Sequence, residues 1–247
     1  MSDLYAALRP RLPPGKRASA GAFYFGVRPS ESHSTMSRFV YLHGFASGPA
    51  SRKASFFRER LAGHGIALEI PDLAEGNFRG LTLTAQLQAI QRLGQGPLVL
   101  IGSSMGGYLA ALYAAAHPGQ VERMVLLAPA FNFYELWTET LGPENLARWR
   151  EQGELSVFHY AAGRPENIGY QLMDDARTYP PYPDAGQPSL VFHGTGDSVV
   201  PLAFSRRFVD AHPSARLVPL ESSHELTDVL DAIWQTSADF LLDAAGQ

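Results

Sequence analysis

Short apolar runs alternate with helical patterns from residue 38 to the end of the chain, and this alternation constrains the fold more than any other feature. Strands are predicted at residues 39–42, 67–70, 98–101, 124–127, 190–192 and 216–220. Helices are predicted at residues 51–62, 83–93, 106–116, 202–211 and 225–242. Such alternation is typical of βαβ units, because parallel strands need a long crossover connection. We therefore expect an α/β protein with a doubly wound, mostly parallel sheet and helices on both faces.

The size and charge of the chain fit one main globular domain. It has 247 residues, with 20 Lys and Arg against 24 Asp and Glu, which gives a net charge of −4. Its 45% hydrophobic and 18% charged residues are typical of a chain that buries a full core. Because nucleic acids attract basic proteins, this net acidic chain is not expected to bind them.

The chain has no cysteine, which excludes disulfides, thiolate metal sites and a cysteine nucleophile. No apolar run approaches the roughly 18 residues that span a bilayer, so no membrane association is expected. The N-terminal region carries basic residues, but its only apolar run is residues 22–27, which is too short for a signal peptide. We therefore expect a cytoplasmic protein.

Residues 1–35 differ from the rest in being rich in proline, glycine and serine, without a sustained periodicity. We interpret them as an N-terminal arm, and residues 36–247 as the main domain. Two alternatives stay open for the arm. In one, Met36 is the true start of the protein, since it leads directly into the first strong strand. In the other, residues 23–25 add an edge strand to the sheet.

A long insertion, at about residues 129–188, interrupts the alternation and is rich in aromatic residues. It is too long for an ordinary crossover, and we interpret it as a cap over the carboxyl edge of the sheet. Its rings either line an apolar substrate pocket or simply pack together. The candidate substrate-binding residues in it are Trp137, Tyr134 and His159.

The strand at residues 98–101 is followed by Gly102-Ser103-Ser104-Met105-Gly106 and then by a helix. The pattern Gly-x-Ser-x-Gly is weak alone, but between a strand and a helix it is typical of a sharp turn that exposes a serine hydroxyl. Small residues are needed on both sides because the turn brings backbones very close together. Ser104 is therefore the predicted nucleophile. A nucleotide-binding turn would instead need Gly-x-Gly-x-x-Gly after the first strand, which is absent.

A serine hydroxyl needs a base to take its proton and an acid to orient that base. His224 follows the strand at residues 216–220 and is the predicted base, and Asp197, after the strand at residues 190–192, is the predicted acid. Asp174 and Asp175 in the insertion are the alternative acids. The other histidines include His43 and His193, interpreted as structural supports at strand ends, and two residues before prolines, His117 and His212, interpreted as helix-end residues.

Acyl transfer also needs backbone N–H groups that stabilise an oxyanion. Met105, directly after the nucleophile, is one predicted donor, because it begins a helix. Phe45, in the loop after the first strand, is the second. Arg52 and Lys53 follow that loop, and they either receive an anionic group of the substrate or remain solvated.

The stretches at residues 41–49, 51–54 and 102–108 resemble the α/β-hydrolase fold family, and in particular the small esterases of the YqiA type and related acyl-ester or thioester hydrolases. The resemblance covers roughly residues 38–243. It implies an eight-stranded core, a Ser104–Asp197–His224 triad, and no metal or organic cofactor. The expected substrate is a small acyl ester or thioester. Carbon–carbon bond hydrolases, cofactor-free haloperoxidases and a non-catalytic receptor on the same scaffold stay open as alternatives.

Overall fold

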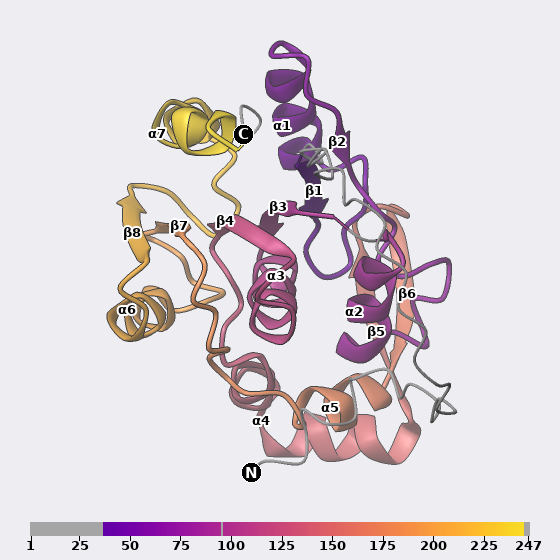
Figure 1. Ribbon diagram of the computed structural model, residues 1–247. Helices are drawn as coiled ribbons and strands as arrows, with labels where there is room; N and C mark the ends of the chain where they lie inside the picture. The colour runs from indigo at the N-terminus through magenta and orange to yellow at the C-terminus, as the bar shows by residue number, and fades with distance from the viewer. Residues whose placement is uncertain (1–36, 95, 245–247) are drawn as a thin grey trace, which may run out of the picture. The chain divides into compact units, whose positions relative to one another are not determined.

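The protein is described by a computed structural model over residues 37–94 and 96–244 (Figure 1). The predicted N-terminal arm, including the alternatives concerning Met36 and residues 23–25, lies outside these described residues. The described part belongs to one compact unit. None of its helices is both long and apolar enough to cross a membrane.

Six parallel strands form the central sheet, in the order β2-β1-β3-β4-β7-β8. Their bounds are β1 Arg38–Leu42, β2 Leu68–Glu69, β3 Leu98–Ser103, β4 Val121–Leu127, β7 Ser189–Gly194 and β8 Ala215–Leu220. All six predicted strands are therefore present, and the predicted parallel sheet is confirmed. The eight strands that the family resemblance implies are not all found in the described residues, whose main sheet has six.

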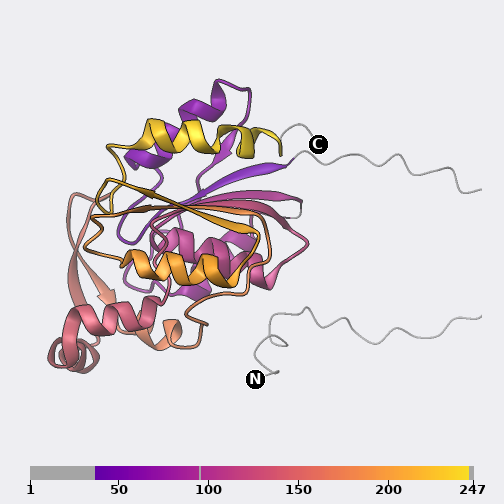
Figure 2. The ribbon, with the colours of Figure 1, turned by 90° about the vertical axis from the view of Figure 1, so that its left-hand side faces the viewer.

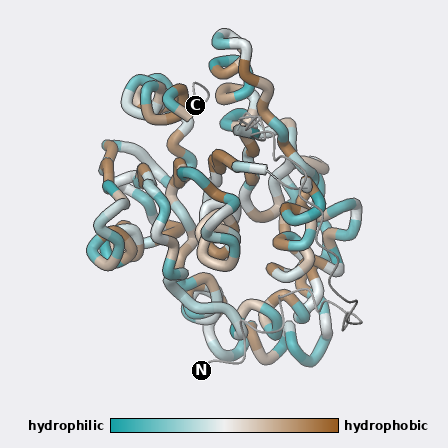
Figure 3. Tube along the Cα trace, viewed as in Figure 1, coloured by the Kyte–Doolittle hydropathy of each residue, from teal (hydrophilic) through white to brown (hydrophobic). Residues whose placement is uncertain are grey.

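Helices cover both faces of this sheet, as predicted (Figure 2). α1 (Arg52–Ala62) and α7 (Leu230–Leu242) lie over one face, whereas α2 (Leu83–Gln91), α3 (Met105–Ala116) and α6 (Leu202–Ala211) lie over the other. Alternate strand residues enter two separate cores, so that Tyr41 packs towards α1 and α7 whereas Leu42 packs towards α3. In Figure 3 hydrophobic residues follow the central strands, and the surrounding helices carry hydrophilic and hydrophobic residues along each turn.

The last helix begins at Leu230, so the prediction that it begins at Glu225 is wrong. The intervening residues form turns, and Leu226 has a backbone φ of 54°, which a helix does not contain. The Leu226 side chain is nevertheless fully buried against the core between α1 and α7. Leu226, which extended the helical pattern in the sequence, thus belongs to a loop and packs against the core.

The segment between β4 and β7 contains α4 (Phe133–Gln152), the antiparallel hairpin β5 (Glu154–His159) and β6 (Arg164–Gly169), and α5 (Gln171–Ala176). α4 is two helices across a kink, since Gly142 has a φ of 72° and Pro143 follows it. The turn of the hairpin contacts the loop after β1, where the Tyr160 N–H donates 2.8 Å to the Ala46 carbonyl. The aromatic insertion therefore reaches the edge of the sheet where β1 ends.

We expect Gly106→Ala to destabilise this fold strongly. A Cβ at Gly106 would lie 2.0 Å from the carbonyl oxygen of Leu42, and a strand backbone cannot move aside cheaply. Since overpacking costs about 1–3 kcal/mol, the unfolding free energy measured in urea should fall by at least about 2 kcal/mol. Gly119→Ala is the control, because a Cβ there meets nothing within 4 Å. Equal unfolding midpoints for the two variants would contradict this account of the turn.

Candidate active site

Ser104 occupies a strained turn between β3 and α3. Its φ and ψ are 52° and −119°, a region that non-glycine residues rarely adopt. The surrounding backbone holds this conformation, because the Ser104 N–H donates 2.9 Å to Leu127 and its carbonyl accepts from Ala130 at 3.0 Å. Small neighbours make the turn possible, since a Cβ at Gly102 would lie 2.4 Å from the Gly106 carbonyl oxygen. Ser104, which carries the hydroxyl, is therefore the residue directly before α3.

The structure brings Ser104, His224 and Asp197 together from three loops. The Nε2 atom of His224 lies 3.1 Å from the Ser104 Oγ, and its Nδ1 atom lies 2.7 Å from Asp197 Oδ2. Because an ionised carboxylate only accepts, Nδ1 carries the proton and Nε2 is the free acceptor that faces the serine hydroxyl. The arrangement is that of a nucleophile, a base and an orienting acid.

The side chain of Asp197 is fully buried, and its carboxylate accepts several hydrogen bonds. Its Oδ1 accepts from the N–H groups of Val199 and Val200, each at 2.8 Å, while His193 Nε2 approaches Oδ2 at 3.2 Å. Burial alone would raise the pKa of Asp197, but the hydrogen bonds from His193, His224 and the Val200 amide outweigh it and hold the pKa well below its ordinary value. Asp197 is therefore ionised throughout the neutral range.

The alternative acids lie elsewhere. Asp175 accepts hydrogen bonds from the Thr84 amide and hydroxyl at the start of α2, and Asp174 pairs with Arg177. Neither carboxylate is bound to His224, whose Nδ1 atom already pairs with Asp197. The structure thus favours Asp197 as the partner of the imidazole.

The loop after β1 lies directly against the serine. A Cβ at Gly44 would meet the Cβ of Ser104 at 3.4 Å, so Phe45 follows a residue in contact with the nucleophile. No backbone carbonyl of the described residues accepts a hydrogen bond from the Phe45 amide. The Met105 amide is the first of α3, where a helix offers no acceptor of its own. Both predicted oxyanion donors are therefore near Ser104 with N–H groups available.

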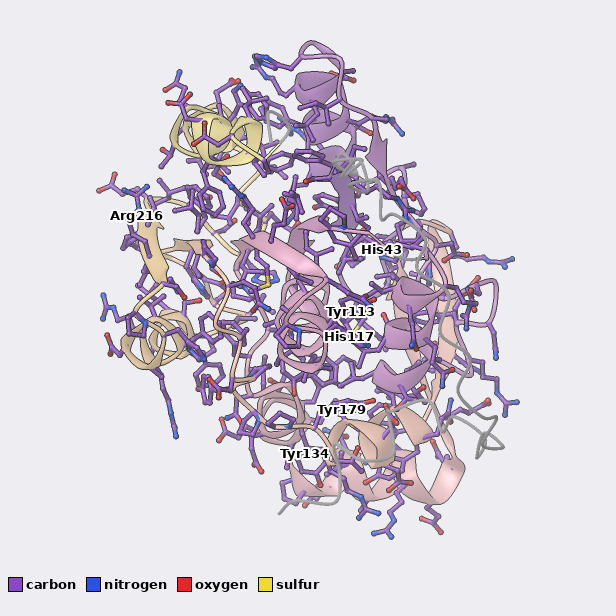
Figure 4. The ribbon with its side chains drawn as sticks, in the orientation of Figure 1. His43, Tyr113, His117, Tyr134, Tyr179 and Arg216 are labelled. Atoms are coloured by element: carbon purple, nitrogen blue, oxygen red, sulfur yellow. The ribbon has the colours of Figure 1, made fainter. Side chains whose placement is uncertain are left out.

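Two further histidines support these loops, as the sequence predicted. His43 donates from Nδ1 to the Gly44 carbonyl at 3.0 Å and accepts the Leu73 amide at Nε2, and burial lowers its pKa. Figure 4 shows it beside α2. The fully buried His193 approaches the Val200 carbonyl with Nε2 at 2.9 Å and contacts the Ser205 hydroxyl with Nδ1 at 2.8 Å. Its contact with Asp197 was not predicted, because only the folded loop brings residues 193 and 197 together.

The helix-end histidines are also where the sequence placed them. His117 Nδ1 contacts the Tyr113 carbonyl at 3.1 Å, and its ring stacks on the Tyr113 ring, as Figure 4 shows. His212 makes the same contact with the Phe208 carbonyl at the end of α6. Both imidazoles thus contact carbonyls in the last turn of their helices.

Aromatic rings connect the loop after β1 to the insertion. The Phe45 ring packs edge-on against Trp137, with 4.9 Å between the ring centroids. It also contacts Phe78 in a tilted arrangement at 5.5 Å between centroids, and Phe78 in turn contacts the His159 ring at 4.4 Å. Two of the three candidate substrate-binding residues therefore join a partly buried aromatic cluster beside Phe45. Tyr134 does not join it, and lies with Tyr179 at the side of the molecule formed by α4 and α5 (Figure 4). Phe78 was missed because nothing in its loop sequence indicates this contact.

Two open grooves lie on the described surface. One, of about 490 Å³, lies between α4 and Tyr170 at the start of α5, and the other, of about 460 Å³, lies between residues 76–79 and β6. Neither groove is lined by Ser104 or His224. The candidate reacting centre therefore rests on the hydrogen-bonded geometry of Ser104, His224 and Asp197, and not on a groove.

The fold and the site define an α/β-hydrolase. The sequence matches the "Uncharacterised protein family (UPF0227)" over residues 38–241, and the chain belongs to this family, which confirms the resemblance seen in the sequence. A monoacylglycerol lipase from Mycolicibacterium smegmatis is 28% identical over 139 residues, which cover 46% of this chain and 49% of the lipase. The chain thus matches about half the length of that curated relative.

Solved structures show the same fold. The mouse alpha/beta hydrolase domain-containing protein 10 superposes with a TM-score of 0.70 at 21% identity, covering 83% of this chain and 89% of its own. Est1E from Butyrivibrio proteoclasticus, with ferulic acid bound, superposes with a TM-score of 0.72 at 20% identity, covering 89% and 93%. Together these matches support a hydrolase on this scaffold.

Asp197 should make the free energy of unfolding depend on pH in the acidic range. Its folded-state pKa lies below the unfolded value of about 3.9, so its ionised form stabilises the fold above about pH 4, and this contribution is lost as pH falls further. We therefore expect Asp197→Asn to lower the unfolding free energy at pH 7, and the difference from the wild type to shrink between about pH 4 and pH 2. Urea unfolding across this range measures it.

Asp210→Asn is the control for this measurement, because Asp210 is an exposed aspartate in α6. Its difference from the wild type should be small at every pH. A deficit of Asp197→Asn that stayed constant down to pH 2 would contradict the depressed pKa.

Proposed function

We propose that this protein is a serine hydrolase that cleaves carboxylic esters or thioesters through an acyl-enzyme on Ser104. The observation that carries the proposal is the chain of hydrogen bonds from Ser104 Oγ through His224 to the buried Asp197 carboxylate. The strained backbone of Ser104 destabilises the fold, since each strained residue costs about 1–3 kcal/mol. Such strain is typical of functional sites.

The proposed reaction begins when His224 Nε2 takes the proton of the Ser104 hydroxyl while Oγ attacks the ester carbonyl. The amides of Phe45 and Met105 donate hydrogen bonds to the oxyanion that forms on the carbonyl oxygen. The bond to the leaving alcohol or thiol then breaks, and the proton on His224 goes to that group. Asp197 keeps Nδ1 protonated and stabilises the imidazolium.

A water molecule then attacks the acyl-enzyme by the same route. His224 takes a proton from the water, the oxygen adds to the acyl carbonyl, and the bond to Ser104 Oγ breaks. The proton returns to Oγ, and a carboxylic acid leaves. No step needs a reactant other than the ester and water, so the chain's own residues account for the complete cycle.

The substrate is proposed to carry an apolar or aromatic acyl group. Several rings of the insertion are fully buried and pack the core, among them Phe131, Phe133 and Trp149. Trp137, His159 and Phe45 are only partly buried and lie at the oxyanion loop, so they are the rings available to a substrate. Two relatives agree with this choice, since one is a monoacylglycerol lipase and the other binds ferulic acid, an aromatic carboxylic acid.

We expect Ser104→Ala to abolish hydrolysis of p-nitrophenyl acyl esters, with kcat at least about 10³-fold lower, because no other group of the site replaces the nucleophile. Asp197→Asn should lower kcat by a similar order, since the imidazole loses its tautomer. Ser214→Ala, which alters an exposed serine after α6, is the control and should retain full activity. Full activity of Ser104→Ala would remove the proposal.

The nature of the substrate is tested with the same assay on matched acyl thioesters and on a vinylogous diketone. Turnover of esters or thioesters without turnover of the diketone supports the proposal. A folded wild type that cleaves only the diketone would assign the triad to carbon–carbon bond hydrolysis. Complete silence, together with an unreactive Ser104, would favour a receptor on a hydrolase scaffold.

Trp137→Ala should change selectivity for the acyl group. Removing the ring beside Phe45 takes away apolar contact area, so kcat/KM should fall about tenfold for long or aromatic acyl esters and much less for acetyl esters. The matched control is Tyr160→Ala, which removes a ring of the same insertion that is 74% exposed. If Trp137→Ala lowered kcat/KM equally for all esters, the ring would support the loop without contacting the acyl group.

A further inference from the structure

The short motif that begins α1, residues 51–54, has no part in the mechanism proposed above. Ser51 is the N-cap of α1 and accepts the Ala54 amide, which accounts for its own role. Arg52 is exposed, as one alternative from the sequence predicted. Lys53 is not solvated, because only 12% of its side chain is exposed. The role of Lys53 therefore needs a separate explanation.

Lys53 reaches the loop that carries His224. Its Nζ atom donates 2.8 Å to the backbone carbonyl of Glu225, the residue directly after His224 and 172 positions away in the sequence. The carboxylate of Glu225 is 3.8 Å from Nζ and 70% exposed, so this ion pair contributes little. The hydrogen bond to the carbonyl is therefore the closer of the two polar contacts that Lys53 makes with this loop.

This is an unfavourable place for a lysine. Burial lowers the pKa of Lys53, opposed by the charges of Glu225 and Asp197, and a cation in the first turn of a helix also opposes the helix dipole. An apolar side chain at this position would avoid both penalties. Groups that stand in such positions are often functional.

The loop between β8 and α7 is held near His224 by polar contacts as well as by the buried Leu226 side chain. It is not helical, and the left-handed Leu226 directly follows Glu225. On one side of His224 the loop is held by the bond from the Gly196 amide to the Ser222 carbonyl at 3.0 Å. On the other side Lys53 holds the Glu225 carbonyl. The imidazole thus lies between two fixed peptide groups.

We propose that Lys53 is a positioning residue for His224: its ammonium holds the Glu225 carbonyl so that the imidazole bridges Asp197 and Ser104. This inference rests on the proposed serine hydrolase function.

The test measures how fast Ser104 is labelled by a fluorophosphonate between pH 5 and pH 9, by intact-protein mass spectrometry. We expect Lys53→Met to lower the maximal labelling rate about tenfold, which corresponds to about 1.4 kcal/mol. Lys53→Arg keeps a charged N–H donor for the Glu225 carbonyl and should restore most of the wild-type rate.

Arg60→Met is the matched control. Arg60 is a cation in the last turn of the same helix that also reaches towards α7, where it pairs with Asp231, but it is far more exposed. Both the labelling rate and the pH profile of this variant should equal those of the wild type. Lys53→Gln, which keeps a neutral donor, replaces Lys53→Met if the latter shows no cooperative thermal transition.

Three results would decide against these ideas. A folded Lys53→Met that labels like the wild type at every pH overturns the proposal for Lys53. A slower Lys53→Met whose rate Lys53→Arg does not restore also contradicts it, because the donor to the Glu225 carbonyl would then not be what sets the rate. A wild type whose Ser104 is never labelled contradicts the serine hydrolase function instead.

Discussion

The close approach of α3 to β1 is the constraint on which the rest of this structure depends. Gly106 lies against the carbonyl of Leu42, where no Cβ fits, and Gly102 faces the first turn of α3 in the same way. This contact allows the chain to turn from β3 into α3 within one residue, and it forces Ser104 into its strained conformation. The same contact sets β1 beside the turn, so the loop after β1 meets Ser104.

Asp197 organises the other side of the site. Its carboxylate is fully buried, yet it stays ionised because backbone amides and two imidazoles donate to it. A buried charge is tolerable only when such donors replace water. The hydrogen bonds of His193 also tie Ser205 and the Val200 carbonyl to this carboxylate, so α6 and the loop after β7 support the acid together.

The insertion contains both fully buried rings that pack the core and partly exposed rings near Phe45. Its fully buried rings fasten α4 to the sheet, and its hairpin turn is bonded to Ala46 next to Phe45. An insertion of this size has to bury some rings in order to fold, which is why ring content alone does not identify a pocket. What distinguishes Trp137 and His159 is their partial exposure and their connection to Phe45 in the loop after β1, which Trp137 contacts directly and His159 through Phe78.

The sequence by itself determined the alternation of strands and helices and the strand–turn–helix setting of Ser104, since both follow from local periodicity and from glycine spacing. It also ordered the three polar residues along the chain, each just after a predicted strand. Parallel strands end at one edge, so their meeting there was foreseeable. The sequence pattern wrongly extended the last helix to residue 225, because Leu226 is apolar in order to pack into the core and not because it belongs to a helix.

Only the tertiary structure decided how that edge is completed. The contact of His193 with Asp197, the place of Phe78 and the bond from Lys53 to the Glu225 carbonyl have no local signal. Each joins loops whose separation is set by the packing of helices on the sheet, and the last spans 172 positions. Periodicity describes one element at a time, and such contacts arise only when several elements are packed together.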